Sequence, residues 1–278
     1  MKRLSFVRAA TLMAATAAVV TGLFAAFSGS ADAAGLTGIR NTKHNLSKDG
    51  PGINKTTDVG EICVFCHTPH GSSSTAAAPL WNKKVADPAS FSGKMYNSQT
   101  FDAVDTVGFI SSSVSLACLS CHDGSQAMDT VLNAPGSGGY NANGATFAGG
   151  WQGANQTAGK MTGLACLMCD GDLKNDHPVG MEYAKWQGNT GANLDADFNQ
   201  ASKIVKGGNN IWYVESGAAS LDPAARDKQD MFLYTRNVNG TDKPYVECAS
   251  CHDPHSDNAT FLRIPNTNSQ VCLTCHTK

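Results

Sequence analysis

Hydrophobic positions along this chain form few long periodic runs. Alternating apolar and polar residues predict a strand at Ile211–Val214 and a hairpin over residues 231–248, where Asn239-Gly240 separates two alternating segments. The stretch from Asn133 to Gly159 is so rich in Gly and Asn that we expect loops there, because such a composition cannot hold a regular element without outside support. The pattern therefore predicts a mostly coil fold with short α-helices and a few short β-strands.

The first residues have the pattern of an export signal. Three basic residues precede an uncharged run rich in Ala, Thr and Val from Ala9 to about Ser30, and Ala31-Asp32-Ala33 supplies small residues before a cleavage site. We therefore predict a signal peptide at residues 1–33 and a functional domain at 34–278, located outside the cell, at its surface or in the periplasm. A retained membrane anchor is the alternative, because the run is nearly long enough to span a bilayer.

Charge and composition constrain the functional domain. Removal of residues 1–33 takes away three basic residues and Asp32, which leaves 18 Lys and Arg against 22 Asp and Glu, a formal charge of −4. This balance argues against nucleic acid as a partner. Residues 34–60 form a polar arm, a subdivision near residue 160 is possible, and the interior is poor in aliphatic core material, so buried cofactors are expected to supply part of it.

The cysteines indicate the class of chemistry. All ten occur in five C-x-x-C pairs, and four pairs are followed at once by histidine. Such a motif attaches a c-type haem, because the two thiols bond the porphyrin vinyl groups and the histidine binds the iron as proximal ligand. In chain order, the first to fourth motifs consist of Cys63, Cys66 and His67; Cys118, Cys121 and His122; Cys248, Cys251 and His252; and Cys272, Cys275 and His276.

Zinc ribbons, thioredoxin-like dithiols and structural disulfides are the competing explanations. None of them needs a histidine directly after the second cysteine. The probability that four of the five pairs are followed by histidine by chance is on the order of one in 10⁵ to 10⁶. We therefore expect four haem c groups, each with a short helical turn at its motif.

The fifth pair, Cys166 and Cys169, is followed by Asp170 instead of histidine. A carboxylate is poorly matched to haem iron in the proximal position, so we expect no fifth haem there. The pair is then a disulfide, a free dithiol or the remnant of a lost haem site.

The remaining histidines match the number of haems. His44, His70, His177 and His255 are the candidate distal ligands, which would give every iron two imidazoles and leave no open position for a substrate. This inventory predicts an electron-transfer protein and not an enzyme. The alternative is that one or two of these histidines are ordinary surface residues and that a methionine such as Met128, Met181 or Met231 completes a site.

Two spare histidines stand three residues after a proximal one, His70 after His67 and His255 after His252. Axial ligands approach one iron from opposite faces, so each spare histidine must serve a different haem unless it binds a propionate. We expect His70 at the haem of the second motif and His255 at that of the fourth. His177 is then left for the first or third motif.

The repeated CVFCHTPH and CASCHDPH indicate a duplicated pair unit. Together with HNLS, CLSCHDGS, NDHPVG and FLRIPNTNSQVCLTCH, they resemble the doubled C-x-x-C-H cytochromes of metal-reducing bacteria. More narrowly, the chain is similar to the tetrahaem OmcE-type extracellular cytochromes that form filaments called nanowires. The CLMCD segment (residues 166–170) departs from that pattern.

The resemblance implies a multihaem cytochrome c fold organised around stacked haems, bis-histidine coordination throughout, and a head-to-tail homopolymer in which each subunit donates a histidine to its neighbour. His44, on the polar arm, is the expected donated ligand. The implied function is conduction of respiratory electrons to redox partner proteins, extracellular metal oxides or other acceptors. A discrete periplasmic electron shuttle, or a subunit of a membrane-associated complex, is the first alternative, and a multihaem reductase of a small oxyanion is the second.

Overall fold

Coil dominates the computed structural model, which describes residues 38–98, 108–136, 138–191, 194–217 and 229–278. Residues 37–278 form one compact unit, and the expected signal peptide lies outside the described residues. In the described part, no helix is both long and apolar enough to cross a membrane. The predicted fold class, mostly coil with short helices and strands, is confirmed.

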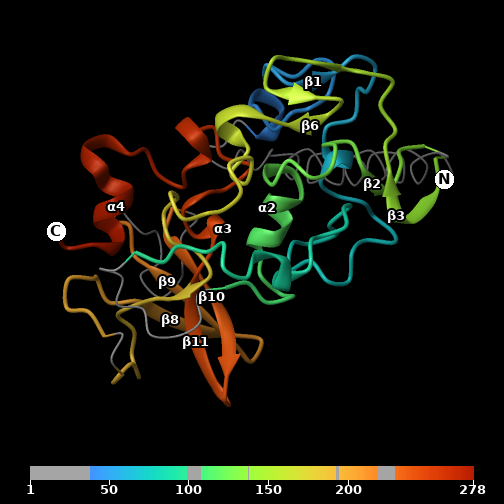
Figure 1. Ribbon diagram of the computed structural model, residues 1–278. Helices are drawn as coiled ribbons and strands as arrows, with labels where there is room; N and C mark the ends of the chain where they lie inside the picture. Colours follow the sequence, from blue (N-terminus) through green and yellow to red (C-terminus); the bar gives the residue numbers. More distant parts are fainter. Residues whose placement is uncertain (1–37, 99–107, 137, 192–193, 218–228) are drawn as a thin grey trace, which may run out of the picture. The chain divides into compact units, whose positions relative to one another are not determined.

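A five-stranded antiparallel sheet is the largest regular element (Figure 1). Its strands are, in spatial order, β7 (Met181–Glu182), β11 (Thr241–Val246), β10 (Met231–Val238), β9 (Asn209–Val214) and β8 (Ser202–Lys206). The predicted strand at Ile211–Val214 is the buried half of β9. The sequence did not predict β7 and β8, because β7 has only two residues and β8 lies at the sheet edge with partly exposed side chains.

The predicted hairpin is confirmed as the β10–β11 pair. Val238 pairs with Thr241 across the turn, and Asn239 and Gly240 both adopt positive φ, at 52° and 84°. Asn and Gly tolerate this left-handed conformation, and a two-residue turn of this kind matches the right-handed twist of the strands it joins.

The Gly- and Asn-rich stretch is more ordered than the expected loops. It contains β3 (Tyr140–Ala145), β4 (Trp151–Gln152) and β5 (Gln156–Thr157). These strands pair with β2 (Val131–Asn133), β1 (Lys55–Thr56) and β6 (Lys160–Met161), respectively. Partner strands thus supply the backbone hydrogen bonds that the composition alone could not predict.

Each C-x-x-C-H motif forms the expected helical turn. The turns are η2 (Cys63–Phe65), α2 (Ser115–His122), α3 (Cys248–Cys251) and α4 (Gln270–Cys275). The other short 3₁₀ turns are η1 (Ile39–Asn41), η3 (Pro88–Phe91), η4 (Gly163–Ala165), η5 (Ala259–Phe261) and η6 (Thr267–Ser269). Cys166 of the CLMCD segment instead has an extended backbone.

The described part of the expected polar arm is anchored. Asn45, Leu46, Ser47 and Thr56 are buried, and the Thr56 N–H donates to the Leu46 carbonyl at 2.9 Å. The arm is therefore part of the packed structure, because Leu46 is buried and the Asn45 amide donates to the Arg40 carbonyl at 2.7 Å.

Three small hydrophobic clusters form the interior and adjoin the motifs. The first packs Trp212, Met231 and Leu233 against cysteines of the third and fourth motifs. The second includes Leu116 and Leu119 of α2. The third packs Phe65 and Met128 against cysteines of the first and second motifs, as expected if cofactors complete the core.

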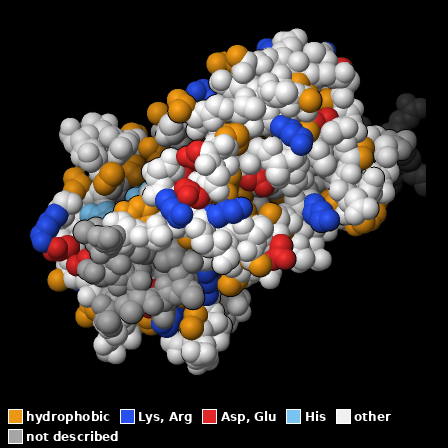
Figure 2. Space-filling view, in the orientation of Figure 1, with side chains coloured by type: hydrophobic (Ala, Val, Ile, Leu, Met, Phe, Trp, Pro, Cys, Tyr) orange, Lys and Arg blue, Asp and Glu red, His pale blue; other side chains and the backbone are white. Residues whose placement is uncertain are grey.

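A buried ion pair connects the sheet to two motif helices. Arg236 Nη2 of β10 lies 2.5 Å from Glu247 Oε1, and both side chains are almost fully buried. Glu247 also caps α3 together with Ser250 and accepts a hydrogen bond from the Ser115 hydroxyl of α2. On the face seen in Figure 2, the exposed Lys and Arg side chains are interspersed with Asp and Glu.

Candidate functional site

The four motifs follow one another in space in the order of the sequence. Cys66 of the first motif and Cys121 of the second pack against the same hydrophobic cluster and interact electrostatically. The thiols of Cys118 and Cys248 interact electrostatically, so the second and third motifs adjoin. The third and fourth motifs adjoin through the second cysteine of each. Consecutive attachment points are thus neighbours.

Burial keeps several of these thiols protonated. Burial raises the pKa of Cys66 to about 12, that of Cys251 to about 11 and that of Cys275 to about 12. A redox dithiol needs a thiolate at neutral pH, which these environments disfavour. They suit cysteines that become thioethers within an apolar pocket.

Six of the eight histidines meet in pairs of facing imidazoles. The ring centroids lie 6.3 Å apart for His67 and His255, 6.2 Å for His44 and His122, and 6.4 Å for His177 and His276. The corresponding interplanar angles are 12°, 83° and 69°. Within the described ranges, no group of three or more His, Cys, Asp or Glu lies close enough to hold a bare metal ion.

The spacing of these pairs fits two imidazoles on opposite sides of one iron. A metal–imidazole bond of about 2.0 Å, with the ring centre about 1.2 Å behind the nitrogen, separates two such centroids by about 6.4 Å. All three pairs lie close to this value, and each includes the proximal histidine of one motif. The residues present therefore fit a six-coordinate c-type haem at the first, second and fourth motifs.

Backbone carbonyls orient three of the proximal rings. The Nδ1 atom of His67 bonds the Pro79 carbonyl at 2.8 Å, and that of His252 bonds the Thr260 carbonyl at 2.8 Å. The His122 Nδ1 bonds a third carbonyl, that of Ala165, at 2.6 Å. Since a carbonyl only accepts, Nδ1 carries the proton and the Nε2 lone pair is free for a metal.

Three of the four distal candidates are also held through Nδ1. His44 and His177 bond the carbonyls of Pro254 and Pro178, at 3.3 and 3.0 Å, and His255 bonds the Asp253 carboxylate at 3.1 Å. Burial, with a smaller effect of the neighbouring His122, lowers the pKa of His44 to about 4. Burial also lowers the pKa of His122. Neutral imidazoles are the form that binds iron.

The pairing differs from the one expected from chain order. His255 faces His67 of the first motif and not the fourth, and His177 faces His276 and not a ring of the first or third motif. His44 lies opposite His122 of its own chain, and its ring stacks on Phe261 at 3.9 Å, so it is not the free ligand that the polar arm suggested. Tertiary contacts bring together rings that are distant in sequence.

His70 and His252 are the two histidines without such a partner. Among the residues that the structure describes, neither ring forms a ring pair with a second imidazole, although His252 lies near enough to His44 and His122 to lower the pKa of both. His70 is exposed, and its backbone is held by Thr68 and Asn133. The expectation that His70 serves the second motif does not match the structure, because His44 already lies opposite His122.

A mostly apolar cavity of about 690 Å³ adjoins the third and fourth motifs. Tyr183, Met231, Leu233 and Val246 line it together with cysteines of both motifs and the pair His177 and His276. Its size and lining fit a porphyrin face. Of the methionines considered as ligands, Met128 and Met231 are buried in hydrophobic clusters and Met181 lines this cavity.

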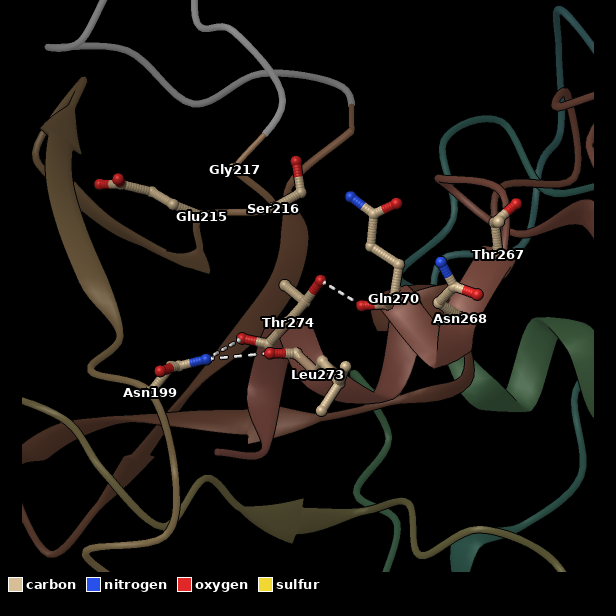
Figure 3. A pocket seen from close by; sticks show the side chains of 9 residues that line it. All are labelled: Asn199, Glu215, Ser216, Gly217, Thr267, Asn268, Gln270, Leu273 and Thr274. Atoms are coloured by element: carbon tan, nitrogen blue, oxygen red, sulfur yellow. Dashed lines mark hydrogen bonds between the residues drawn. The ribbon is translucent and has the colours of Figure 1, made fainter. Parts of the chain in front are cut away.

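A second cavity, of about 360 Å³, has a polar lining that includes Glu215 (Figure 3). Asn199 Nδ2 donates to the carbonyls of Leu273 and Thr274 at 3.0 Å, which ties α4 to the loop before β8. Asn199, which lines this cavity, therefore fixes the helix of the fourth motif.

Cys166 and Cys169 form a disulfide, which is one of the three states expected for this pair. Asp170 is exposed and accepts a hydrogen bond from Asn175 Nδ2 at 2.8 Å. The segment lacks the helical turn of the four motifs. Its residues do not fit a haem.

The carbonyls of Pro79, Ala165 and Thr260 were missed by sequence reasoning. Any residue type can supply a backbone carbonyl, so no sequence pattern could have identified these three acceptors. The carboxylate of Asp253 could have been found, because it lies between two histidines in CHDPH.

Comparison with known proteins supports the chemistry of the last two motifs. The family model described as "Doubled CXXCH motif" matches residues 243–278, which carry the third and fourth motifs. No curated protein matches the chain. The doubled motif is a c-type cytochrome-like feature, and its chemistry is c-type haem binding and electron transfer.

Proposed function

We propose that this chain is an exported electron carrier with four haem c groups, which polymerises head to tail into an extracellular conducting filament. The observation that carries the proposal is the set of three facing imidazole pairs, each spaced for one iron and each including a motif histidine. The family match at residues 243–278 supports the attachment chemistry.

A bound haem supplies an iron that accepts and releases one electron reversibly. The cysteines of each motif would hold the cofactor covalently, and at the first, second and fourth motifs the paired imidazoles would occupy the positions at which a substrate could bind. The protein is on this basis a carrier and not an enzyme. Ligation by two histidines, without the methionine that raises the potential, suits low-potential respiratory electrons.

The order of the motifs supports transfer along the chain. The thiols of Cys118 and Cys248 interact electrostatically, and the other consecutive motifs share hydrophobic clusters. Attachment points this close hold cofactors near one another, as a relay requires.

The third motif supports the assembly. His252 has no facing imidazole within the described residues, and His70 is an exposed imidazole with no facing partner. His70 of one subunit would therefore lie opposite His252 of the next subunit. Such a contact is heterologous, and it generates an open filament when it repeats without closing into a ring. His70 takes the role that the sequence assigned to His44, and the acceptors at the filament surface are metal oxides, redox partner proteins or other cells.

Electron microscopy of the purified holoprotein tests this proposal, after mass spectrometry has counted its haems. The wild-type chain should carry four haems and form filaments. His70→Gln should carry four haems and remain monomeric, because the amide cannot replace an imidazole on iron. Ser74→Gln, an exposed position four residues away, is the matched control and should polymerise.

Filaments formed by His70→Gln would rule out the assigned ligand. Monomers of the wild-type chain at all concentrations would select the discrete periplasmic shuttle. Carbon monoxide binding to more than one haem of the monomer would reveal several open iron positions and would favour a reductase.

A further inference from the structure

The CLMCD segment lies against the end of α2 that carries His122. The Ala165 carbonyl accepts the hydrogen bond of the His122 ring at 2.6 Å, and the Leu167 N–H donates to the His122 carbonyl at 2.8 Å. Cys166, only 6% exposed, stands between these two contacts and is joined to Cys169. The ring closed by the disulfide therefore begins between Ala165 and Leu167, the two residues whose backbone groups hold His122.

Gly124, two residues beyond His122, brings α2 against the disulfide. Its φ is +69°, and a Cβ there would lie 2.7 Å from Cys166 Sγ and 3.2 Å from Cys169 Sγ. No larger residue fits without moving the sulfur atoms. The disulfide and the end of α2 are thus packed directly against each other.

The rings of His67 and His252 are oriented by carbonyls that lie nearer along the chain. The carbonyls that orient His67 and His252 lie 12 and 8 residues further along the chain, whereas Ala165 lies 43 residues from His122. A longer loop costs more entropy to close, so a remote acceptor has to be fixed by its own surroundings. The covalent ring at Cys166 restrains the backbone next to that acceptor.

We propose that the Cys166–Cys169 disulfide positions His122 and makes the haem of the second motif sensitive to thiol reductants, which rests on the proposed haem at Cys118 and Cys121. A hydrogen bond from Nδ1 to a fixed carbonyl makes the imidazole a stronger donor and favours oxidised iron. Loss of the bond therefore raises the potential of this haem.

The chemistry of the switch balances with an external dithiol. The dithiol transfers two electrons and two protons to the pair, the S–S bond breaks, two S–H bonds form, and the reagent closes to its own disulfide. Cys169 is exposed, so a small reagent has access. Ala165 and Leu167 then lose the restraint that holds them on His122.

Potentiometric titration and low-temperature electron paramagnetic resonance of the holoprotein test the proposal. One sample is treated with dithiol, its new thiols are capped with iodoacetamide, and the reagents are removed. A second sample is the double variant Cys166→Ser and Cys169→Ser. In both samples, the reduction potential of one haem should rise by about 59 mV. This shift corresponds to a tenfold change in the equilibrium constant of a one-electron couple. The low-spin signal of the perpendicular pair, His44 and His122 at 83°, should change with it.

The matched control is Asp170→Asn, which alters the same segment outside the disulfide and should leave all four potentials in place. Unchanged potentials in both samples, or an equal shift of all four, would overturn the proposal. A missing haem at Cys118 and Cys121 in the mass spectrum would instead refute the proposed function, and the two failures are thereby distinguishable.

Discussion

The imidazole of His255 faces that of His67 in a nearly parallel arrangement, with 6.3 Å between ring centroids and 12° between ring planes. The two rings come from opposite ends of the chain. His67 belongs to the first motif, whereas His255 follows the third. A haem held between them would cross-link the N- and C-terminal segments of the fold.

The variant His255→Met is expected to raise the potential of one haem and to remove one low-spin signal, because a thioether donates less to iron than an imidazole does. The signal lost should be the rhombic one that parallel rings give, since such rings split the iron orbitals that perpendicular rings leave nearly equal in energy. Electron paramagnetic resonance of the monomer measures this. His70→Met is the control and should leave the intrachain signals unchanged, whereas loss of the perpendicular signal in His255→Met would contradict the pairing.

Lys83 is fully buried, and its ammonium donates to three backbone carbonyls, those of Ala127, Met128 and Thr130, at 3.1, 3.1 and 2.7 Å. Lys83→Met keeps the length of the side chain but leaves these acceptors without a charged donor. We expect a loss of about 3 kcal/mol in the free energy of unfolding. The guanidinium midpoint of the holoprotein measures it.

The neighbouring exposed Lys84 gives the control for this measurement. Lys84→Met should change the free energy of unfolding by no more than about 0.5 kcal/mol. Equal losses for the two variants would show that the three carbonyl contacts of Lys83 do not stabilise the fold.

The turn at Gly240 offers a test of the hairpin. Its φ of +84° is disfavoured for a residue with a Cβ, although open space surrounds the position. Gly240→Ala should therefore cost about 1 kcal/mol through backbone strain alone. Gly60→Ala is the control, because Gly60 has equally open surroundings and no left-handed conformation, and it should not destabilise the chain. A neutral Gly240→Ala in the same denaturation experiment would argue against this turn.

Much of the local structure could be read from the residues. The Asn239-Gly240 turn, the strand ending at Val214 and a helical turn at each C-x-x-C-H all depend on conformational preferences that neighbouring residues set. The strands β3 and β4 could not be read in this way, because their partners β2 and β1 lie elsewhere in the chain.

The sequence by itself determined which cysteines and histidines form the four C-x-x-C-H motifs, because two thiols and an adjacent imidazole at fixed spacing are a local feature of the chain. Only the tertiary structure decided which histidines face one another, and it leaves His70 and His252 without a facing ring among the described residues. It also decided that the Cys166–Cys169 segment lies against His122. The second imidazole of each pair comes from a distant segment. Its position depends on the packing of the whole chain, which spacing along the sequence does not specify.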